Sequence, residues 1–174
     1  MAENRCGKIH RGGTELMGTI DSLRGSVVGF DTMPLIYYIE EHPTYLKVVE
    51  PFFRAIEHGE FEVVTSVITL LEVLVHPIRN GDIELAQEYR TLLFDTEGLS
   101  TNIINREIAE EASRLRALYK IRTPDSIQLA TAILGGASYF LTNDVHFQSL
   151  PDIKILLLDN LKKEIESEQQ SQEP

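Results

Sequence analysis

Four acidic side chains stand at positions from which they could act together. Asp31 and Asp144 each follow a short apolar run of the kind that forms a buried strand. Asp125 lies in the first turn of a predicted helix, and Glu72 lies among the apolar residues of another. Two carboxylates about 4 Å apart repel by ~4 kcal/mol near a protein surface, so a shared pocket must take up protons or hold a cation. Because the ligands are oxygens, with no Cys or His set, they favour Mg²⁺ or Mn²⁺, ions suited to phosphodiester hydrolysis.

Each acid also has a purely structural explanation. Asp31 can cap the helix that follows it, Asp125 favours the dipole of its own helix, and Asn143-Asp144 is an ordinary turn pair. Glu72 can lie on a narrow solvated stripe, because an unpaired charge is costly to bury. The return of a carboxylate at a second strand end favours a shared site over these separate explanations.

Strands and helical segments alternate along the chain. Strands are predicted at 27–30, 61–64, 98–104, 138–141 and 154–158. This alternation predicts an α/β protein, a three-layer α/β/α sandwich whose central sheet is mostly parallel. Ligands bind at the carboxyl edge of such a sheet, and all four acids should reach that edge.

Capping residues mark several helix boundaries. Thr32 should cap the helix after the first strand, and Thr123 the helix that contains the third acid. Thr65 or Ser66 should begin a helix that ends at His76-Pro77. Further helices are predicted over 43–58, 83–94 and 106–120.

Length and composition indicate one domain with polar ends. The 174 residues suffice for a sizeable core. Residues 1–25 are Gly-dotted and polar, and we expect a flexible arm there; 160–174 should form an acidic, polar tail that is a fraying helix or disordered. The single cysteine, Cys6, excludes a disulfide framework, and no apolar run is long enough to span a membrane. We therefore expect a cytoplasmic protein without a membrane association.

The charge balance limits how the chain could meet nucleic acid. Acidic residues number 27 against 16 basic ones, for a net charge of −11, which argues against broad binding through a positive surface. A cluster of site carboxylates neutralised by bound cations would remain compatible with a nuclease. The densest basic patch comprises Arg114, Arg116, Lys120 and Arg122. Taken alone, it could equally be a solvated helix face.

Four stretches carry a family resemblance when they are taken together. They are Asp31-Thr32 followed by Leu35-Ile36, Thr69-Leu70-Leu71-Glu72, Asp125-Ser126-Ile127-Gln128-Leu129-Ala130-Thr131-Ala132, and Leu141-Thr142-Asn143-Asp144 with Phe147. In this order the sequence resembles PIN-domain proteins, most of all the VapC-type ribonuclease toxins of toxin–antitoxin pairs. The resemblance covers about residues 27–158, and it makes 26–159 a PIN-like nuclease domain.

The resemblance implies a metal-dependent endoribonuclease that uses Mg²⁺ or Mn²⁺. The acids implied as both catalytic and metal-binding are Asp31, Glu72, Asp125 and Asp144. Thr142 and Thr32 would support the site, and Phe147 would serve packing. It also implies homodimers and a small antitoxin protein that inserts a segment into the active-site groove. RNA phosphates would then meet the basic patch of Arg114, Arg116, Lys120 and Arg122, which leads along the chain into Asp125.

Two other activities that use acids at strand ends fit these residues less well. A receiver domain needs an early acidic pair and a strand-end lysine, whereas Asp31 has no acidic neighbour and Lys154 begins a strand. An aspartyl-nucleophile phosphatase needs Asp-x-Asp after its first strand, which Asp31-Thr32-Met33 lacks. Two alternatives stay open at this point: a non-catalytic PIN-fold interaction module and a solitary RNA-processing nuclease.

Overall fold

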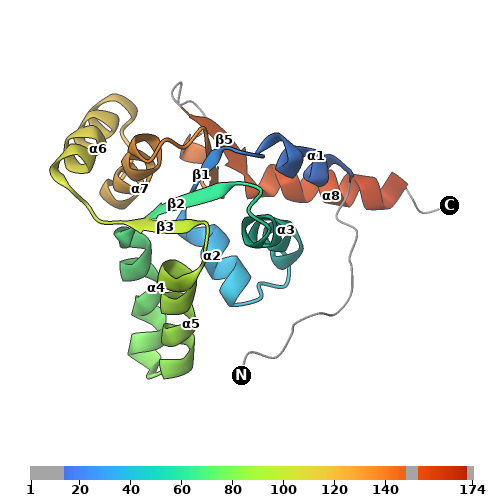
Figure 1. The fold of residues 1–174 in the computed structure, drawn as a ribbon, viewed down its shortest axis with the longest axis horizontal. Coiled ribbons are helices and arrows are strands. Elements are labelled where there is room, and N and C mark those ends of the chain that lie inside the picture. The colour runs from blue at the N-terminus through green and yellow to red at the C-terminus, as the bar shows by residue number, and fades with distance from the viewer. Residues whose placement is uncertain (1–13, 148–152, 172–174) are drawn as a thin grey trace.

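A parallel five-stranded sheet forms the centre of the computed structural model, which describes residues 14–147 and 153–171 (Figure 1). The strand order is β3-β2-β1-β4-β5, and every neighbouring pair is parallel. The strands are β1 (Val27–Phe30), β2 (Glu62–Ser66), β3 (Leu99–Asn102), β4 (Tyr139–Thr142) and β5 (Lys154–Leu157). The predicted sheet is confirmed, and it is parallel throughout the described residues.

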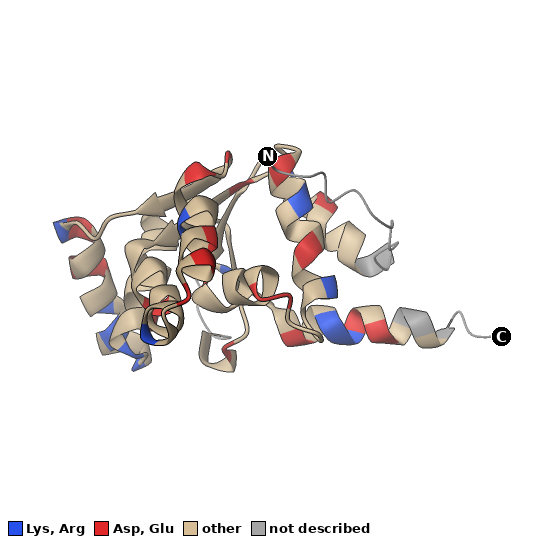
Figure 2. Cartoon of the chain, turned by 90° about the horizontal axis from the view of Figure 1, so that it is seen from below, with Lys and Arg blue, Asp and Glu red and all other residues tan. Residues whose placement is uncertain are grey.

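Eight α-helices and one 3-10 turn accompany the sheet in the described residues. They are α1 (Thr14–Ser22), α2 (Thr32–Ile39), α3 (Leu46–Glu57), α4 (Val67–Asn80), α5 (Ile83–Asp95), α6 (Arg106–Tyr119), α7 (Thr123–Leu134), η1 (Val145–Phe147) and α8 (Leu158–Ser171). Among these residues, no helix combines the length and apolarity needed to cross a membrane. Acidic and basic segments are both spread over several helices (Figure 2).

Two apolar cores lie on opposite faces of the sheet. Val63 and Leu141 pack into the core made with α1, α2, α3, α5 and α8, whereas Val64 and Phe140 pack into the core made with α6 and α7. Neighbouring residues of a strand point to opposite faces, so this division is the period-two pattern of a sheet covered on both sides. The three-layer α/β/α sandwich predicted from the sequence is confirmed.

Gly29 allows α7 to lie directly on the central strand. A Cβ added at Gly29 would come within 2.4 Å of the Ala132 Cβ and 2.7 Å of a Phe140 ring carbon. Real side chains do not approach so closely, so a larger residue at this position would push α7 away from β1. This contact brings the start of α7, with Asp125, toward the carboxyl end of β1, with Asp31.

The two chain ends contribute more to the core than the sequence indicated. Leu16 and Ile20 of α1 are buried, as are Leu161 and Ile165 of α8, and the two helices pack against each other. The prediction of a flexible arm is therefore wrong for 14–22, and that of a fraying or disordered tail is wrong for the start of α8. Each of these helices carries a short apolar stripe on an otherwise polar segment. Each becomes stable only by packing against the other. Residues 1–13 and 172–174 lie outside the described part of the chain.

Two helix boundaries also differ from their predictions. Thr123 is the first residue of α7 and Arg122 is its cap, so the prediction that Thr123 caps this helix is wrong; the end of α4 differs as well. Helix α4 passes through Pro77 and ends at Gly81, whose φ of 70° lies in the left-handed region and whose N–H bonds the carbonyl of Pro77. Proline removes one backbone hydrogen bond from a helix interior, but Pro77 is buried, and its packing offsets that loss. The predicted cap at Ser66 is confirmed, because its hydroxyl accepts the N–H of Ile68.

Candidate active site

The four predicted acids come together at the carboxyl edge of the sheet. Asp31, Glu72, Asp125 and Asp144 all line one pocket of about 690 Å³. They come from the end of β1, the second turn of α4, the first turn of α7 and the loop after β4. The apolar wall of the pocket is made by Met33, Ile36, Leu71, Val75 and Val145. The prediction that these acids share one cleft is confirmed.

Asp31 is both a helix cap and a pocket residue. Its Oδ1 accepts the N–H of Thr32 at 2.8 Å, and its Oδ2 accepts the hydroxyl of Thr142 at 2.6 Å. Burial raises the pKa of Asp31 to about 6 against these two hydrogen bonds, and the charges of Glu72 and Asp125 add to the rise. The prediction that Thr32 caps α2 is wrong, because Asp31 is the cap. Asp31 therefore caps α2, as its structural explanation predicts, and the same side chain lines the pocket.

Glu72 is held by neutral side chains. The hydroxyl of Thr32 donates a short hydrogen bond to its Oε2, and the Nε2 of Gln128 lies 3.4 Å from the same oxygen. Thr32 is buried because it begins the inward face of α2. Glu72 therefore does not belong to a solvated stripe of α4; it lies half-buried in the pocket wall, as a site residue would.

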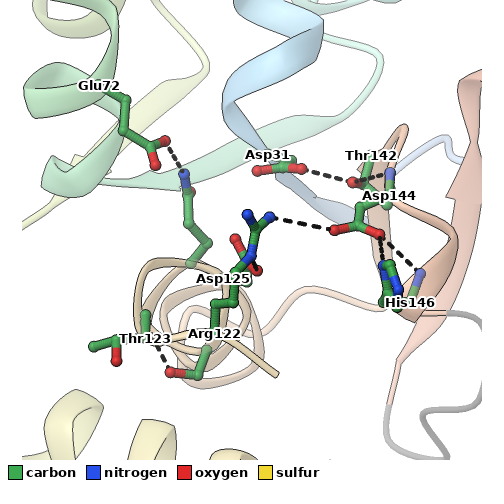
Figure 3. Close-up of polar contacts among 10 residues, drawn as sticks. Asp31, Glu72, Arg122, Thr123, Asp125, Thr142, Asp144 and His146 are labelled. Carbon is green, nitrogen blue, oxygen red and sulfur yellow. Dashed lines mark hydrogen bonds and ion pairs between the residues drawn. The ribbon is translucent and has the colours of Figure 1, made fainter. Parts of the chain in front are cut away.

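Asp144 is fixed by the strand end before it and the turn after it (Figure 3). Thr142 accepts the N–H of Asp144 at 3.0 Å while donating to Asp31, so one hydroxyl connects two acids. The backbone N–H and ring Nδ1 of His146 contact Asp144 Oδ1 at 2.9 and 2.6 Å. Burial by itself would raise the pKa of Asp144, but the contacts with His146 and the charge of Arg122 outweigh it and hold that pKa below its usual range.

Arg122 points into the acidic pocket instead of lying along the predicted basic patch. Its Nε bonds Asp125 Oδ2 at 2.9 Å, and its terminal nitrogen lies 3.7 Å from Asp144 Oδ2 (Figure 3). Arg114 also differs from expectation, because it pairs with Glu111 at 2.6 Å on α6. Arg116 and Lys120 are exposed at the end of α6. Two of the four residues of the predicted patch are therefore paired with acids, and the other two are exposed.

The pocket suits a hard cation by donor type but is not assembled around one. Within residues 14–147 and 153–171, no three Asp, Glu, His or Cys side chains lie close enough together to hold a metal ion. The donors nevertheless are carboxylate oxygens, the class that Mg²⁺ and Mn²⁺ prefer. The guanidinium between Asp125 and Asp144 shows that these two acids accommodate a positive charge between them. The residues present therefore fit Mg²⁺ or Mn²⁺ by the chemistry of their donor atoms, and their side chains would have to move closer together to hold an ion.

Sequence reasoning missed several residues that support the site. Gln128 follows Asp125 by three positions and so lies on the same face of α7, a signal that the spacing did contain. Asn143 donates to the Tyr45 hydroxyl at 3.2 Å and accepts the N–H of Asp159 at 3.2 Å, which connects the Asp144 loop to α3 and α8. These partners are distant in sequence and left no local signal. Phe147 is buried against Phe140, as the packing prediction required.

Comparison with solved structures finds the same fold in chains of toxin–antitoxin complexes. A chain of a toxin–antitoxin complex from Klebsiella pneumoniae matches with 28% identity and a TM-score of 0.58, over 76% of this chain and 98% of that one. Chains of VapBC2 from Rickettsia felis bound to a promoter DNA fragment (17% identity, TM-score 0.57, 75% and 98% covered) and of DNA-bound VapBC from Salmonella typhimurium (20%, 0.53, 76% and 98%) share the fold. A search of curated proteins found no significant sequence match.

A family model matches the sequence across the residues of the acidic site. The PIN domain model matches residues 29–153. That range begins in β1, ends before β5 and includes all four pocket acids. The parallel sheet, the acids at its carboxyl edge and this match agree, and the chain belongs to the PIN domain family.

Proposed function

We propose that this chain is a Mg²⁺- or Mn²⁺-dependent endoribonuclease and the toxin of a toxin–antitoxin pair. The proposal rests on one observation above all: carboxylates from four separate elements line a single pocket at the ligand-binding edge of the sheet. Such a set is costly to gather without a cation to neutralise it. A non-catalytic member of the fold would have no need for it.

The four acids would hold the ion, and the neighbouring side chains would hold the acids. When bound, the ion supplies Lewis-acid chemistry, because it activates water for in-line attack on the phosphodiester and stabilises the leaving oxygen. Asp31 and Asp144 are oriented by the shared hydroxyl of Thr142. Arg122 has to leave Asp125 and Asp144 when the ion binds, and its guanidinium is then available to an RNA phosphate.

The proposal of an antitoxin partner is supported by a structurally similar protein and by the apolar wall of the pocket. The Klebsiella pneumoniae structure is a toxin–antitoxin complex, and here the acidic pocket continues into an apolar wall that includes exposed Leu71 and Val75. A short amphipathic segment of a small antitoxin would cover that wall, and the chain would act in the cytoplasm as a homodimer. A small open reading frame directly upstream of the gene would support this assignment; its absence would favour a solitary RNA-processing nuclease.

Cleavage and RNA binding should be measured side by side with the Asp125→Asn variant. With Mg²⁺ or Mn²⁺, the wild-type protein should cut an end-labelled single-stranded RNA internally, and EDTA should stop it. Asp125→Asn should lose cleavage by at least about a thousandfold while keeping RNA affinity, because it alters the ion site and leaves the surface unchanged. Either ion should also raise the melting temperature of the wild type by mass action, and this rise should vanish in Asp31→Asn/Asp125→Asn.

Glu88→Gln is the matched control, since Glu88 is an exposed acid of α5 outside the pocket. It should keep cleavage, ion binding and RNA affinity. A wild type that binds RNA but never cuts it with either ion would support a non-catalytic interaction module and overturn the proposal. Cleavage that survives Asp125→Asn would remove this pocket from the chemistry.

A further inference from the structure

A chain of buried hydrogen bonds runs through the core to Glu72. The hydroxyl of Thr65 on β2 donates to the hydroxyl of Thr69 on α4 at 2.8 Å, and it also lies 3.0 Å from the carbonyl of Phe30. Thr69 donates to the Oε1 of Gln128 on α7 at 3.2 Å. The exposed fractions of Thr65, Thr69 and Gln128 are 1%, 0% and 2%. Three elements of the sandwich are therefore joined by polar side chains that are shielded from water.

These contacts give the Gln128 amide one orientation. Because its Oε1 is taken by Thr69, its Nε2 points to the Thr32 hydroxyl at 2.6 Å and to Glu72 Oε2 at 3.4 Å. Thr32 accepts this N–H, so its own proton is directed to Glu72 Oε2. Both donors thus meet the same oxygen of Glu72, and the side chain of Glu72 is held against the pocket wall.

A glutamine at this position needs an explanation. A fully buried amide is expensive unless every polar atom is paired, and methionine or leucine would fill the same volume without that cost. Two of the three partners of Gln128 are residues of the acidic pocket, not of the apolar core. The amide is therefore directed at the site.

We propose that Gln128 is a positioning residue. Through Thr32, it holds the Glu72 carboxylate in the orientation that is needed when the ion and the RNA phosphate bind. The role rests on the proposed function, since it concerns the same pocket. Gln128 contacts neither substrate nor ion; it acts by keeping Glu72 in one arrangement before either arrives. Partners of this kind behind metal ligands typically contribute about 10- to 100-fold to metal affinity.

The test compares Gln128→Met with Thr131→Val. Thr131 is a buried residue of the same helix, and its hydroxyl bonds only the carbonyl of Ile127 one turn earlier among the contacts of the described residues. Gln128→Met should raise the Mg²⁺ or Mn²⁺ concentration for half-maximal thermal stabilisation by about tenfold. It should also slow single-turnover RNA cleavage at low ion more than at saturating ion. Thr131→Val should change the metal-free melting temperature without changing the ion midpoint.

A double-mutant comparison in EDTA tests the connection without any ion. The double variant Gln128→Met/Thr32→Val should lose less melting temperature than the two single variants together, because both interrupt one path. The effects of Gln128→Met and Glu88→Gln should add, since Glu88 is an exposed acid of α5 outside the pocket. Full additivity in the first pair would show that the path does not exist. If Gln128→Met and Thr131→Val need the same ion concentration for half-maximal thermal stabilisation, the positioning role is overturned while the nuclease proposal stays intact. A wild type that responds to neither ion and cuts no RNA would instead overturn the proposed function, and this role with it.

Discussion

The two walls of the acidic pocket hold their carboxylates in different ways. On the inner wall, Asp31 and Glu72 are bound by neutral donors, namely the hydroxyls of Thr142 and Thr32. At the rim, Asp144 contacts Arg122 and His146, whose side chains are 78% and 81% exposed. Neutral donors fix an oxygen in place without cancelling its charge, whereas the exposed guanidinium of Arg122 offsets charge and is free to leave.

This difference explains how four acids coexist before any ion arrives. Burial raises the pKa of Asp31 to about 6, so the inner wall reduces repulsion by favouring the protonated form. At the rim, His146 and Arg122 hold the pKa of Asp144 low despite its burial, so this carboxylate stays charged and paired. The inner wall is therefore pre-arranged and the rim is exchangeable, which is the division of roles expected of a site that binds an ion and then a polyanion.

The largest effect should come from neutralising the inner wall with Asp31→Asn. The unfolded chain loses the Asp31 proton near its ordinary pKa of 3.8, whereas the folded chain keeps it to about pH 6. Folding stability contributed by this group is therefore complete below about pH 4 and is lost as the pH rises through about 6, by about 3 kcal/mol in all. In EDTA at pH 7.5, the free energy of unfolding of Asp31→Asn should therefore exceed that of the wild type by up to about 3 kcal/mol.

Urea unfolding in EDTA at pH 4 and pH 7.5 measures this difference. The advantage of Asp31→Asn should shrink toward zero at pH 4, where both side chains are uncharged in the folded protein. Glu88→Gln, which changes an exposed acid of α5, should show no such pH-dependent gain. If Asp31→Asn is no more stable than wild type at pH 7.5, the burial of the Asp31 carboxylate carries no energetic cost, and the contrast between the walls disappears.

An intermediate effect is expected at the rim from Arg122→Gln. Removing the guanidinium takes away a cation that competes with the ion for Asp125 and Asp144. The Mg²⁺ or Mn²⁺ concentration for half-maximal thermal stabilisation should fall roughly two- to five-fold, the range that exposed ion pairs support. Arg114→Gln is the control, because Arg114 pairs with Glu111 away from the pocket. A higher ion requirement in Arg122→Gln would show that the rim cation assists the ion and does not give way to it.

The smallest effect should come from the surface beyond the rim, with Arg116→Ala and Lys120→Ala combined. Both residues are exposed near the start of α7. Without these two cations to bind phosphates of a single strand, the dependence of log affinity on log salt should flatten by roughly 1.4, while turnover at saturating RNA stays unchanged. Lys47→Ala/Lys163→Ala, which removes two other exposed lysines, should leave the slope as in wild type. An identical salt dependence in both double variants would mean that RNA follows another surface.

Sequence alone determined the alternating elements and the acids at their ends. Local signals suffice for these features, because a strand is a short apolar run and a helix start is a capping pattern. Once the strands are parallel, the geometry of the sheet brings their carboxyl ends to one edge. The positions of Asp31 and Asp144 after strands, and of Asp125 in a first helical turn, therefore predict the pocket from the sequence alone.

Tertiary structure alone decided the partners that the acids take from distant parts of the chain. The Gln128–Thr32 hydrogen bond joins residues 96 positions apart, and nothing in either local sequence indicates the other. The contact of Arg122 with Asp144 also joins residues that are distant in sequence, and the weak apolar stripes of α1 and α8 gain stability only from each other. Local propensity fixes what a segment can form, but burial, charge and hydrogen bonding depend on neighbours that only the folded chain brings together.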